Sequence, residues 1–285
     1  MQQPAALDLR VNTLFATRDE VLQALQTECM EAQATPYSPI GIRLKDKPAL
    51  TRHPLFLSGK IEIQDEGSQL LGYLLAPRRN EMVVDFCAGA GGKTLMLGAM
   101  MNSSGRLYAF DISEKRLANL KPRLKRSGLS NLHPQLIAHE NDSKVKRLAG
   151  KIDRVLVDSP CSGLGTLRRS PDLKFRQSPQ SLIELKHQQT AKRLPPANCS
   201  NSAVGWCMPL AVSCPKKTAR LLIHFLPRTQ TSYCVPPEKF SRNKKSRWKQ
   251  ASACNSCRNC TAPMLFLRQC WNDIRRRYVL PHPLF

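Results

Sequence analysis

The sequence predicts an α/β fold: a mostly parallel sheet covered by helices and preceded by a small α+β unit. Short apolar runs typical of buried strands alternate with segments whose apolar residues recur at helical spacing. This alternation indicates a parallel sheet, because a helix usually carries the chain back between neighbouring parallel strands. A second observation is that acidic residues lie at the ends of four successive predicted strands. The length of 285 residues suits one large or two modest domains.

Residues 1–60 predict the small α+β unit. Residues 7–12 alternate apolar and polar side chains, which indicates a strand. Thr17 precedes a helical apolar pattern whose first turn is acidic, a common start of a helix. Residues 40–44 form a second short predicted strand. We expect this unit to end near residue 60.

Residues 61–190 predict the larger domain. A helix is expected over 70–75, after the polar stretch 63–68. The elements after it follow in the order strand 82–86, helix 95–100, strand 107–111, helix 114–126, strand 134–138 and strand 152–157. This series predicts a parallel sheet in which all strands end on the same side.

The composition changes near residue 190. The first 190 residues hold 27 of the 44 basic residues and 19 of the 21 acidic ones, which leaves only Glu238 and Asp273 as acids in 191–285. That last segment holds eight of the 11 cysteines and one of the 14 glycines, Gly205. Turns and helix ends normally use glycine. The two parts therefore do not resemble one protein.

The net charge of +23 indicates a polyanionic partner, and nucleic acid is the first candidate. No apolar run reaches the ~18 residues that a membrane helix needs. The N-terminus lacks the basic stretch and apolar core of a signal peptide. We therefore expect a cytoplasmic protein with no membrane partner, and a monomer by default.

Three glycines, Gly89, Gly91 and Gly92, lie between a predicted strand and its helix. Glycine at such a turn lets the backbone approach a ligand closely. The run Gly-Ala-Gly-Gly-Lys lacks the spacing of a dinucleotide-binding fingerprint. Taken alone, these glycines fit a tight strand-to-helix turn equally well.

Acidic residues strengthen the case for a ligand. Asp111 ends the strand after the one that ends at Asp85, where a carboxylate can accept both hydroxyls of a ribose. Asp142 and Asp158 follow the third and fourth predicted strands. Strand ends that are merely polar would explain one or two of these acids. Four together predict a shared crevice at the carboxyl ends of the strands.

The turn Asp158-Ser159-Pro160-Cys161 follows the fourth predicted strand. Pro160 stiffens it, and Cys161 is placed where a thiol would face the crevice; a buried structural cysteine is the alternative. The paired arginines Arg168 and Arg169 that follow are suited to contacts with phosphate.

Residues 7–189 resemble the RsmB (Sun/Fmu) family of S-adenosylmethionine-dependent RNA 5-methylcytosine methyltransferases. Three motifs define the resemblance: Asp-Glu-Gly-Ser at 65–68, the run 85–94 through the glycines, and the run 157–166 through Cys161, which Arg-Arg-Ser-Pro-Asp at 168–172 extends. The family usually has proline where Ala90 stands and alanine where Ser159 stands.

The resemblance implies a Rossmann-like methyltransferase sheet, S-adenosyl-L-methionine as cofactor, RNA (16S rRNA) as partner, and no metal. Asp111 would hold the ribose, Asp142 would face the adenine, and Asp158 would contact both the cofactor and the target cytosine. Cys161 would be the second cysteine, which assists product release, and Arg168 and Arg169 would bind RNA. The residues that would wrap the methionine end of the cofactor are Cys87, Ala88, Gly89, Ala90, Gly91, Gly92 and Lys93.

The nucleophile of the family, the cysteine of a Thr-Cys-Ser motif after a fifth strand, is absent from the sequence. Reverse translation of residues 204–218, begun two bases later, permits Arg-Leu-Val-Tyr-Ala-Thr-Cys-Ser, the strand and motif of the family. The same shift over 265–273 permits the C-terminal strand of the family. We therefore expect a frameshift near residues 189–192, an out-of-frame and poorly folded tail over 191–285, and a sheet that is incomplete after its fourth strand. An unstable and inactive product would follow.

Two alternatives remain. A zinc module could use the four cysteines Cys254, Cys257, Cys260 and Cys270, although no predicted strand or helix frames them. A non-catalytic remnant that binds the cofactor or RNA would differ from the enzyme only in lacking the nucleophile. A methyltransferase that acts on protein ranks third, because Cys161 suits chemistry on a base. Disulfides among the eight tail cysteines are not expected in a reducing cytoplasm.

Overall fold

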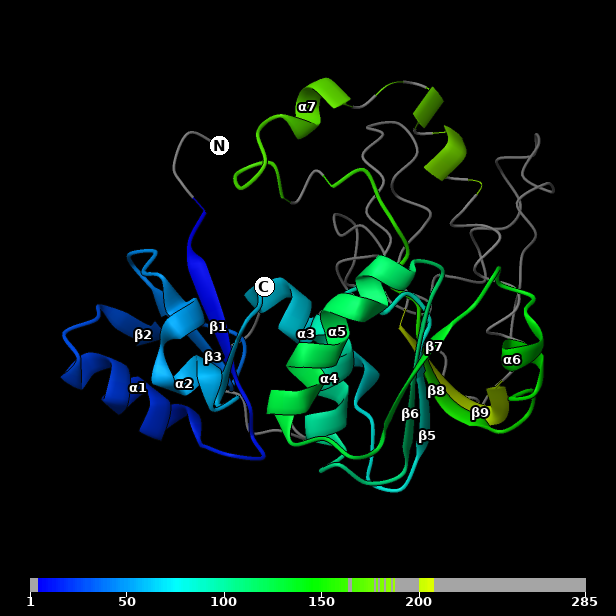
Figure 1. Ribbon diagram of the computed structural model, residues 1–285, viewed down its shortest axis with the longest axis horizontal. Helices are drawn as coiled ribbons and strands as arrows, with labels where there is room; N and C mark the ends of the chain where they lie inside the picture. Colours follow the sequence, from blue (N-terminus) through cyan, green and yellow to red (C-terminus); the bar gives the residue numbers. More distant parts are fainter. Residues whose placement is uncertain are drawn as a thin grey trace, which may run out of the picture.

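The computed structural model describes residues 5–163, 166–176, 178, 180–181, 183–185, 187 and 200–207. These residues form two sheets, one of four strands in the order β2-β3-β1-β4 and one of five strands in the order β7-β6-β5-β8-β9. The first sheet is antiparallel and the second is parallel. Figure 1 shows the two sheets as neighbouring units joined through α3. The predicted α/β class and the small preceding α+β unit are confirmed.

The first unit contains two helices packed on the four-stranded sheet. Thr17 caps the first of them as predicted: its side chain accepts from the Glu20 N–H, and the Glu20 carboxylate accepts from the Thr17 N–H, which completes a capping box. Val21 and Leu25 of this helix are buried against the sheet. The elements in chain order are β1 (Leu7–Val11), α1 (Arg18–Thr27), β2 (Ala32–Ala34), β3 (Gly41–Leu44), the 3-10 helix η1 (Leu50–Arg52), α2 (Pro54–Leu57) and β4 (Ile61–Ile63).

The second unit alternates strands and helices along the chain. Its elements are α3 (Glu66–Leu75), β5 (Met82–Asp85), α4 (Gly92–Met100), β6 (Arg106–Asp111), α5 (Glu114–Ser127), β7 (Leu132–Leu136), α6 (Ser143–Lys146), β8 (Ile152–Leu156), α7 (Leu173–Arg176) and β9 (Ser200–Cys207). The third strand begins two residues before its predicted position. Pro134 is tolerated in β7 because, among the described strands, this strand pairs only with β6 and lies at the edge of the sheet.

The two faces of the parallel sheet are covered by different helices. Val83 packs with residues of α3, α4 and α5, whereas the adjacent Val84 packs with Val145 of α6 on the other face. Figure 1 shows α3, α4 and α5 on one side of the sheet and α6 on the other. The strand order reverses between β5 and β8, so a crevice is expected at the carboxyl ends of these strands.

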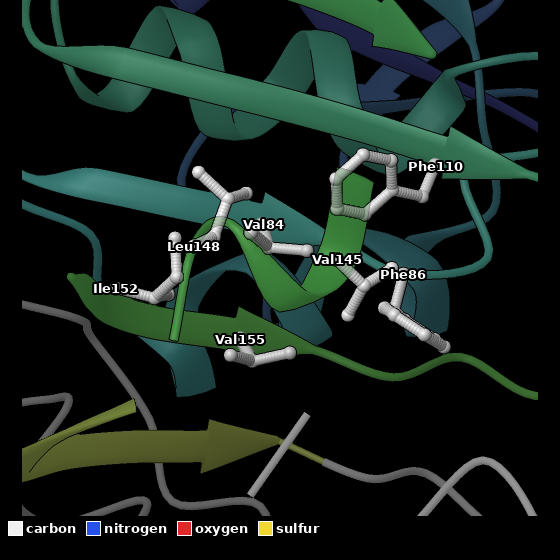
Figure 2. A pocket seen from close by; sticks show the side chains of 7 residues that line it. All are labelled: Val84, Phe86, Phe110, Val145, Leu148, Ile152 and Val155. Atoms are coloured by element: carbon white, nitrogen blue, oxygen red, sulfur yellow. The ribbon is translucent and has the colours of Figure 1, made fainter. Parts of the chain in front are cut away.

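The face under α6 contains a small apolar cavity, shown in Figure 2. Its lining side chains come from β5, β6, β8, α6 and the segments that flank them, and all are apolar: Val84, Phe86, Phe110, Val145, Leu148, Ile152 and Val155. A cavity with no polar group on its wall offers nothing to hold a water or a polar ligand. We therefore treat it as part of the hydrophobic core.

The expectation that the sheet stops at its fourth strand is wrong. β9 pairs in parallel with β8, with Val155 opposite Trp206 and Leu156 opposite Cys207, and an irregularity lies between Ile152 and Arg154. The physical reason is that an edge strand offers unpaired backbone N–H and C=O groups, and these can pair with almost any sequence. The remainder of the predicted out-of-frame tail, 191–199 and 208–285, lies outside the described residues.

Candidate active site

A cavity of about 1000 Å³ opens at the carboxyl ends of β5, β6 and β8. It lies where the strand order reverses, which is the usual position of a ligand in an open α/β sheet. Most residues predicted from the sequence line it, namely Cys87, Ala88, Gly89, Ala90, Gly92, Lys93, Asp111, Asp158, Cys161 and Arg169. Three predicted residues are not in this lining: Gly91, Asp142 and Arg168.

The glycine loop, residues 87–93, joins β5 to α4 and forms one wall of the cavity. Gly89 and Gly91 both have positive φ angles, 57° and 81°. A Cβ atom on Gly89 would meet nothing within 4 Å, whereas one on Gly91 would lie 2.1 Å from Leu120 Cδ1. The loop thus needs Gly89 for its conformation, and it needs Gly91 for both its conformation and close packing against α5.

This difference predicts unequal effects of alanine at the two positions. Gly91→Ala should lower the free energy of unfolding by about 2–4 kcal/mol, because it adds backbone strain and a clash with Leu120. Gly89→Ala should cost only about 1 kcal/mol, since its cost is backbone strain alone. Urea unfolding of both variants measures the difference. Equal losses would contradict the described packing of α5 against the loop.

Asp111 is held in a fixed orientation at the end of β6. Its side chain is 3 % exposed and accepts hydrogen bonds from the N–H groups of Gly89 and Ser113, both at 2.8 Å. Each carboxylate oxygen therefore accepts one backbone hydrogen bond and retains further acceptor capacity for a ligand. Arg116 Nη1 lies 3.5 Å from Oδ2. Such a carboxylate can accept two hydroxyl groups without moving.

Lys93 and Asp158 form an ion pair inside the cavity. Lys93 Nζ lies 2.5 Å from Asp158 Oδ2, and both side chains are partly buried. Cys161, three residues later, is a free and exposed thiol that also lines the cavity. The ion pair joins the glycine loop to the Asp-Ser-Pro-Cys turn. The sequence alone had assigned these two residues to separate motifs.

Asp85 lies at the floor of the cavity and is almost fully buried. Burial raises its pKa to about 6, although a hydrogen bond from Thr94 Oγ1 at 2.7 Å and the charge of Lys93 both favour the anion. The folded-state pKa of this carboxyl exceeds its ordinary value of 3.8. Its ionisation therefore lowers the free energy of unfolding as pH rises from the ordinary pKa to the folded-state pKa. The penalty is absent below about pH 4 and complete above about pH 6.

Asp85→Asn should therefore stabilise the protein at pH 8 and have little effect at pH 4. The gain in the free energy of unfolding caused by Asp85→Asn should grow by about 3 kcal/mol between about pH 4 and pH 6, since one unit of pKa corresponds to about 1.4 kcal/mol. Unfolding in urea at several pH values measures it, and the exposed Asp46→Asn is the control. A gain that does not grow between pH 4 and pH 6 would contradict a strained buried charge at Asp85.

Asp142 is not brought into the cavity. Its carboxylate instead caps α6 and accepts from the N–H groups of Lys144 and Ala138, both at 2.9 Å. These hydrogen bonds, that of Ala138 first, lower its pKa. Ala138 does line the cavity. Asp142 therefore supports the lining at Ala138 and is not itself part of the lining.

The two arginines after the Asp-Ser-Pro-Cys turn differ in their surroundings. Arg169 Nη2 forms an ion pair with Asp65 and donates to the Ala6 carbonyl at 2.9 Å, so it ties this segment to the first unit. Burial raises the pKa of Asp65 while the charge of Arg169 opposes that shift. Arg168 is exposed and is not part of the cavity lining. Arg169 is exposed as well.

Sequence patterns did not single out several lining residues. Ile63 and Ile112 are apolar yet 40 % and 55 % exposed, and both line the cavity. Ile112 could have been found by its place directly after Asp111, at the end of the same strand. Arg123 and His139 come from segments that carry no motif.

Metal and membrane sites are not part of the described structure. Within residues 5–163 and the shorter described segments, no three His, Cys, Asp or Glu side chains gather as metal ligands. The candidate zinc cysteines from Cys254 to Cys270 lie outside the described residues. None of the helices in the described part is long and apolar enough to cross a membrane.

Comparison with known proteins matches both units of the chain. Residues 72–194 match the sequence family "16S rRNA methyltransferase RsmB/F", and residues 1–51 match the ferredoxin-like domain of RsmF/B-like methyltransferases. A probable ribosomal RNA small subunit methyltransferase B from Synechocystis is 38 % identical in an alignment of 193 residues that covers 66 % of this chain and 42 % of that protein. A human 28S rRNA (cytosine(4447)-C(5))-methyltransferase is 30 % identical over 65 % of this chain and 23 % of its own length.

A solved structure has the same arrangement. A methyltransferase homologue from Pyrococcus horikoshii superposes with a TM-score of 0.64 at 26 % identity and covers 75 % of this chain and 67 % of its own. The chain spans less than half the length of the curated relatives that it matches. Residues 1–51 and 72–194 match two domains of the same family, and the second match includes most of the cavity lining, so the chain belongs to the RsmB/F methyltransferase family.

Proposed function

We propose that the cavity binds S-adenosyl-L-methionine and that the chain derives from an RNA cytosine-C5 methyltransferase. The observation that carries the proposal is the convergence of the glycine loop, Asp111 and the Asp158–Cys161 turn on one cavity of about 1000 Å³. This volume exceeds what one nucleoside-sized cofactor needs and leaves room for a base beside it. The names of the relatives, which specify ribosomal RNA and cytosine C5, support the choice of substrate.

In this proposal the described residues bind and orient the cofactor, which supplies the methyl group. Backbone groups of the glycine loop face its methionine end, and Asp111 accepts the two ribose hydroxyls. Ile112 and the wall that Asp142 supports lie against the adenine. Asp158 faces the cytosine, and its ion pair with Lys93 holds the carboxylate in place. Arg168 is the proposed contact with an RNA phosphate.

The chemistry requires a cysteine thiolate that adds to C6 of cytosine and makes C5 nucleophilic. Methyl transfer to C5, loss of the C5 proton and elimination of the cysteine complete the reaction. In this proposal Cys161, which lines the cavity, is the cysteine that assists this elimination. The sequence contains no Thr-Cys-Ser motif, so we propose that the chain as written binds its cofactor but does not form the covalent intermediate.

We propose that a frameshift near residues 189–192 removed this motif. The codons possible for two segments of the tail permit family motifs in the same shifted frame, and the tail is poor in acids and glycine. The family match ends at residue 194, beside the proposed shift. Resequencing of the codons for 188–193 in the source DNA tests this. A missing base would support it, and an intact frame without a Thr-Cys-Ser motif in the other frame would rule it out.

The second candidate is a protein that only binds the cofactor or RNA. The absence of the nucleophile motif favours it for the chain as written. Methyl transfer by a chain with the shifted frame restored separates the two candidates, as set out in the Discussion. A monomeric cytoplasmic protein remains part of the proposal.

A further inference from the structure

Arg123 of α5 connects the first unit of the chain to the glycine loop. Its Nη1 donates to the Ala90 carbonyl at 2.7 Å, at the tip of the loop. Its Nε and Nη2 donate to the Glu62 carboxylate of β4 at 3.1 and 2.8 Å. One planar guanidinium therefore spans the two units of the molecule.

The Glu62 end of this connection is rigid. The Glu62 side chain is 6 % exposed, and β4 is held in register by pairing with β1. The other carboxylate oxygen accepts from Arg126 Nη2 at 2.7 Å, and Arg126 also lies over the ring of Phe56 at 4.2 Å. Charge-assisted hydrogen bonds in such a partly buried place are stronger than neutral ones. Glu62 is thus an anchor that two arginines of α5 share.

The Ala90 end of the connection needs an external contact. Ala90 lies between Gly89 and Gly91, and glycines impose little conformational preference of their own on the backbone. Leu120, three residues before Arg123 and on the same face of α5, packs against Gly91. Helix α5 therefore fixes the loop at two adjacent points, by packing at Gly91 and by a hydrogen bond at Ala90.

We infer that Arg123 is a positioning residue for the cofactor: it transmits the position of Glu62 in the first unit to the glycine loop through the Ala90 carbonyl. This inference rests on the proposed function, because it takes S-adenosyl-L-methionine as the ligand of the loop. Arg123 also lines the cavity, on the side of Gln64 and Gly92. Through this link the first unit would influence the affinity of the glycine loop for the cofactor.

Arg126 provides a matched control, since it shares the Glu62 carboxylate and has no hydrogen bond to the loop. We expect Arg123→Gln in the full chain to raise the Kd for S-adenosyl-L-methionine about 10-fold, measured by isothermal titration. Arg126→Gln should leave the Kd within about 2-fold of that of the unsubstituted chain. It should lower the melting temperature about as much as Arg123→Gln does. The Kd of Arg123→Lys should lie between those of the unsubstituted chain and Arg123→Gln. One ammonium group cannot hold both Glu62 and the Ala90 carbonyl in the same geometry.

An equal rise of Kd in the two glutamine variants, or no rise in either, would overturn the inference. Hydrogen exchange of the amides of 89–92 without ligand tests it independently of the cofactor. Faster exchange in Arg123→Gln alone supports it, and unchanged or equal exchange in both variants overturns it. If the unsubstituted chain binds no S-adenosyl-L-methionine, the proposed function fails, and the exchange experiment still decides the role of Arg123.

Discussion

Restoring the frame that we propose was shifted is expected to convert a chain that we propose to be inactive into an RNA methyltransferase. One base inserted into the codons for 189–192 brings the downstream message into the frame that permits Thr-Cys-Ser. Loss of a covalent nucleophile commonly costs several orders of magnitude in rate. We therefore expect transfer of labelled methyl groups to ribosomal RNA to rise at least about 1000-fold over the chain as written.

The control is the restored chain with the cysteine of its Thr-Cys-Ser motif changed to alanine, which should be as inactive as the chain as written. Methyl transfer by the chain as written would contradict the account, because it would require another nucleophile. Cys161→Ala in that chain would then show whether the exposed thiol of the cavity had taken this role.

Asp111→Asn is expected to have the largest effect on cofactor binding among substitutions of the described residues. The carboxylate is already oriented by the Gly89 and Ser113 N–H groups, and an amide removes one acceptor and the negative charge. Hydrogen bonds to charged groups contribute about 2 kcal/mol, so the Kd for S-adenosyl-L-methionine should rise about 30-fold. Isothermal titration of the full chain measures it.

Asp142→Asn is the matched control for this experiment. Asp142 also follows a strand of the parallel sheet, but it caps α6. Asparagine keeps the oxygen that accepts from the Lys144 N–H and loses the acceptor of the Ala138 N–H, without removing a group from the cavity lining. The Kd of the Asp142→Asn chain for S-adenosyl-L-methionine should therefore stay within about 2-fold of that of the unsubstituted chain. A loss as large as that of Asp111→Asn would mean that Asp142 contacts the cofactor directly, as the family resemblance implied.

Local patterns predicted those elements whose formation depends on nearby residues. The capping box at Thr17 and the apolar strands around Val84 and Phe110 are signals of this kind, and the structure confirms them. The three-residue strands β2 and β4 were missed, because so few residues give no measurable alternation and pairing with β1 and β3 decides their conformation. β9 was missed because its pairing depends on the open edge of β8.

In the candidate site, too, local patterns predicted some features, whereas others depend on residues far apart in the sequence. The glycine loop and Asp111 lie in the cavity as predicted, since each follows a strand that ends there. Asp142 follows a strand too, but the start of α6 uses its carboxylate. The ion pairs of Arg169 with Asp65 and of Arg123 with Glu62 join residues 104 and 61 positions apart, and no local pattern predicts such pairs.

Titration of the purified full chain with S-adenosyl-L-methionine tests the central claim most directly. The account predicts saturable binding at one site per chain, weakened by Asp111→Asn and unchanged by Asp142→Asn. Binding without turnover would agree with a cavity that retains its glycine loop and lacks the nucleophile. A folded chain that binds no S-adenosyl-L-methionine would contradict the assignment of the cavity and, with it, the proposed function.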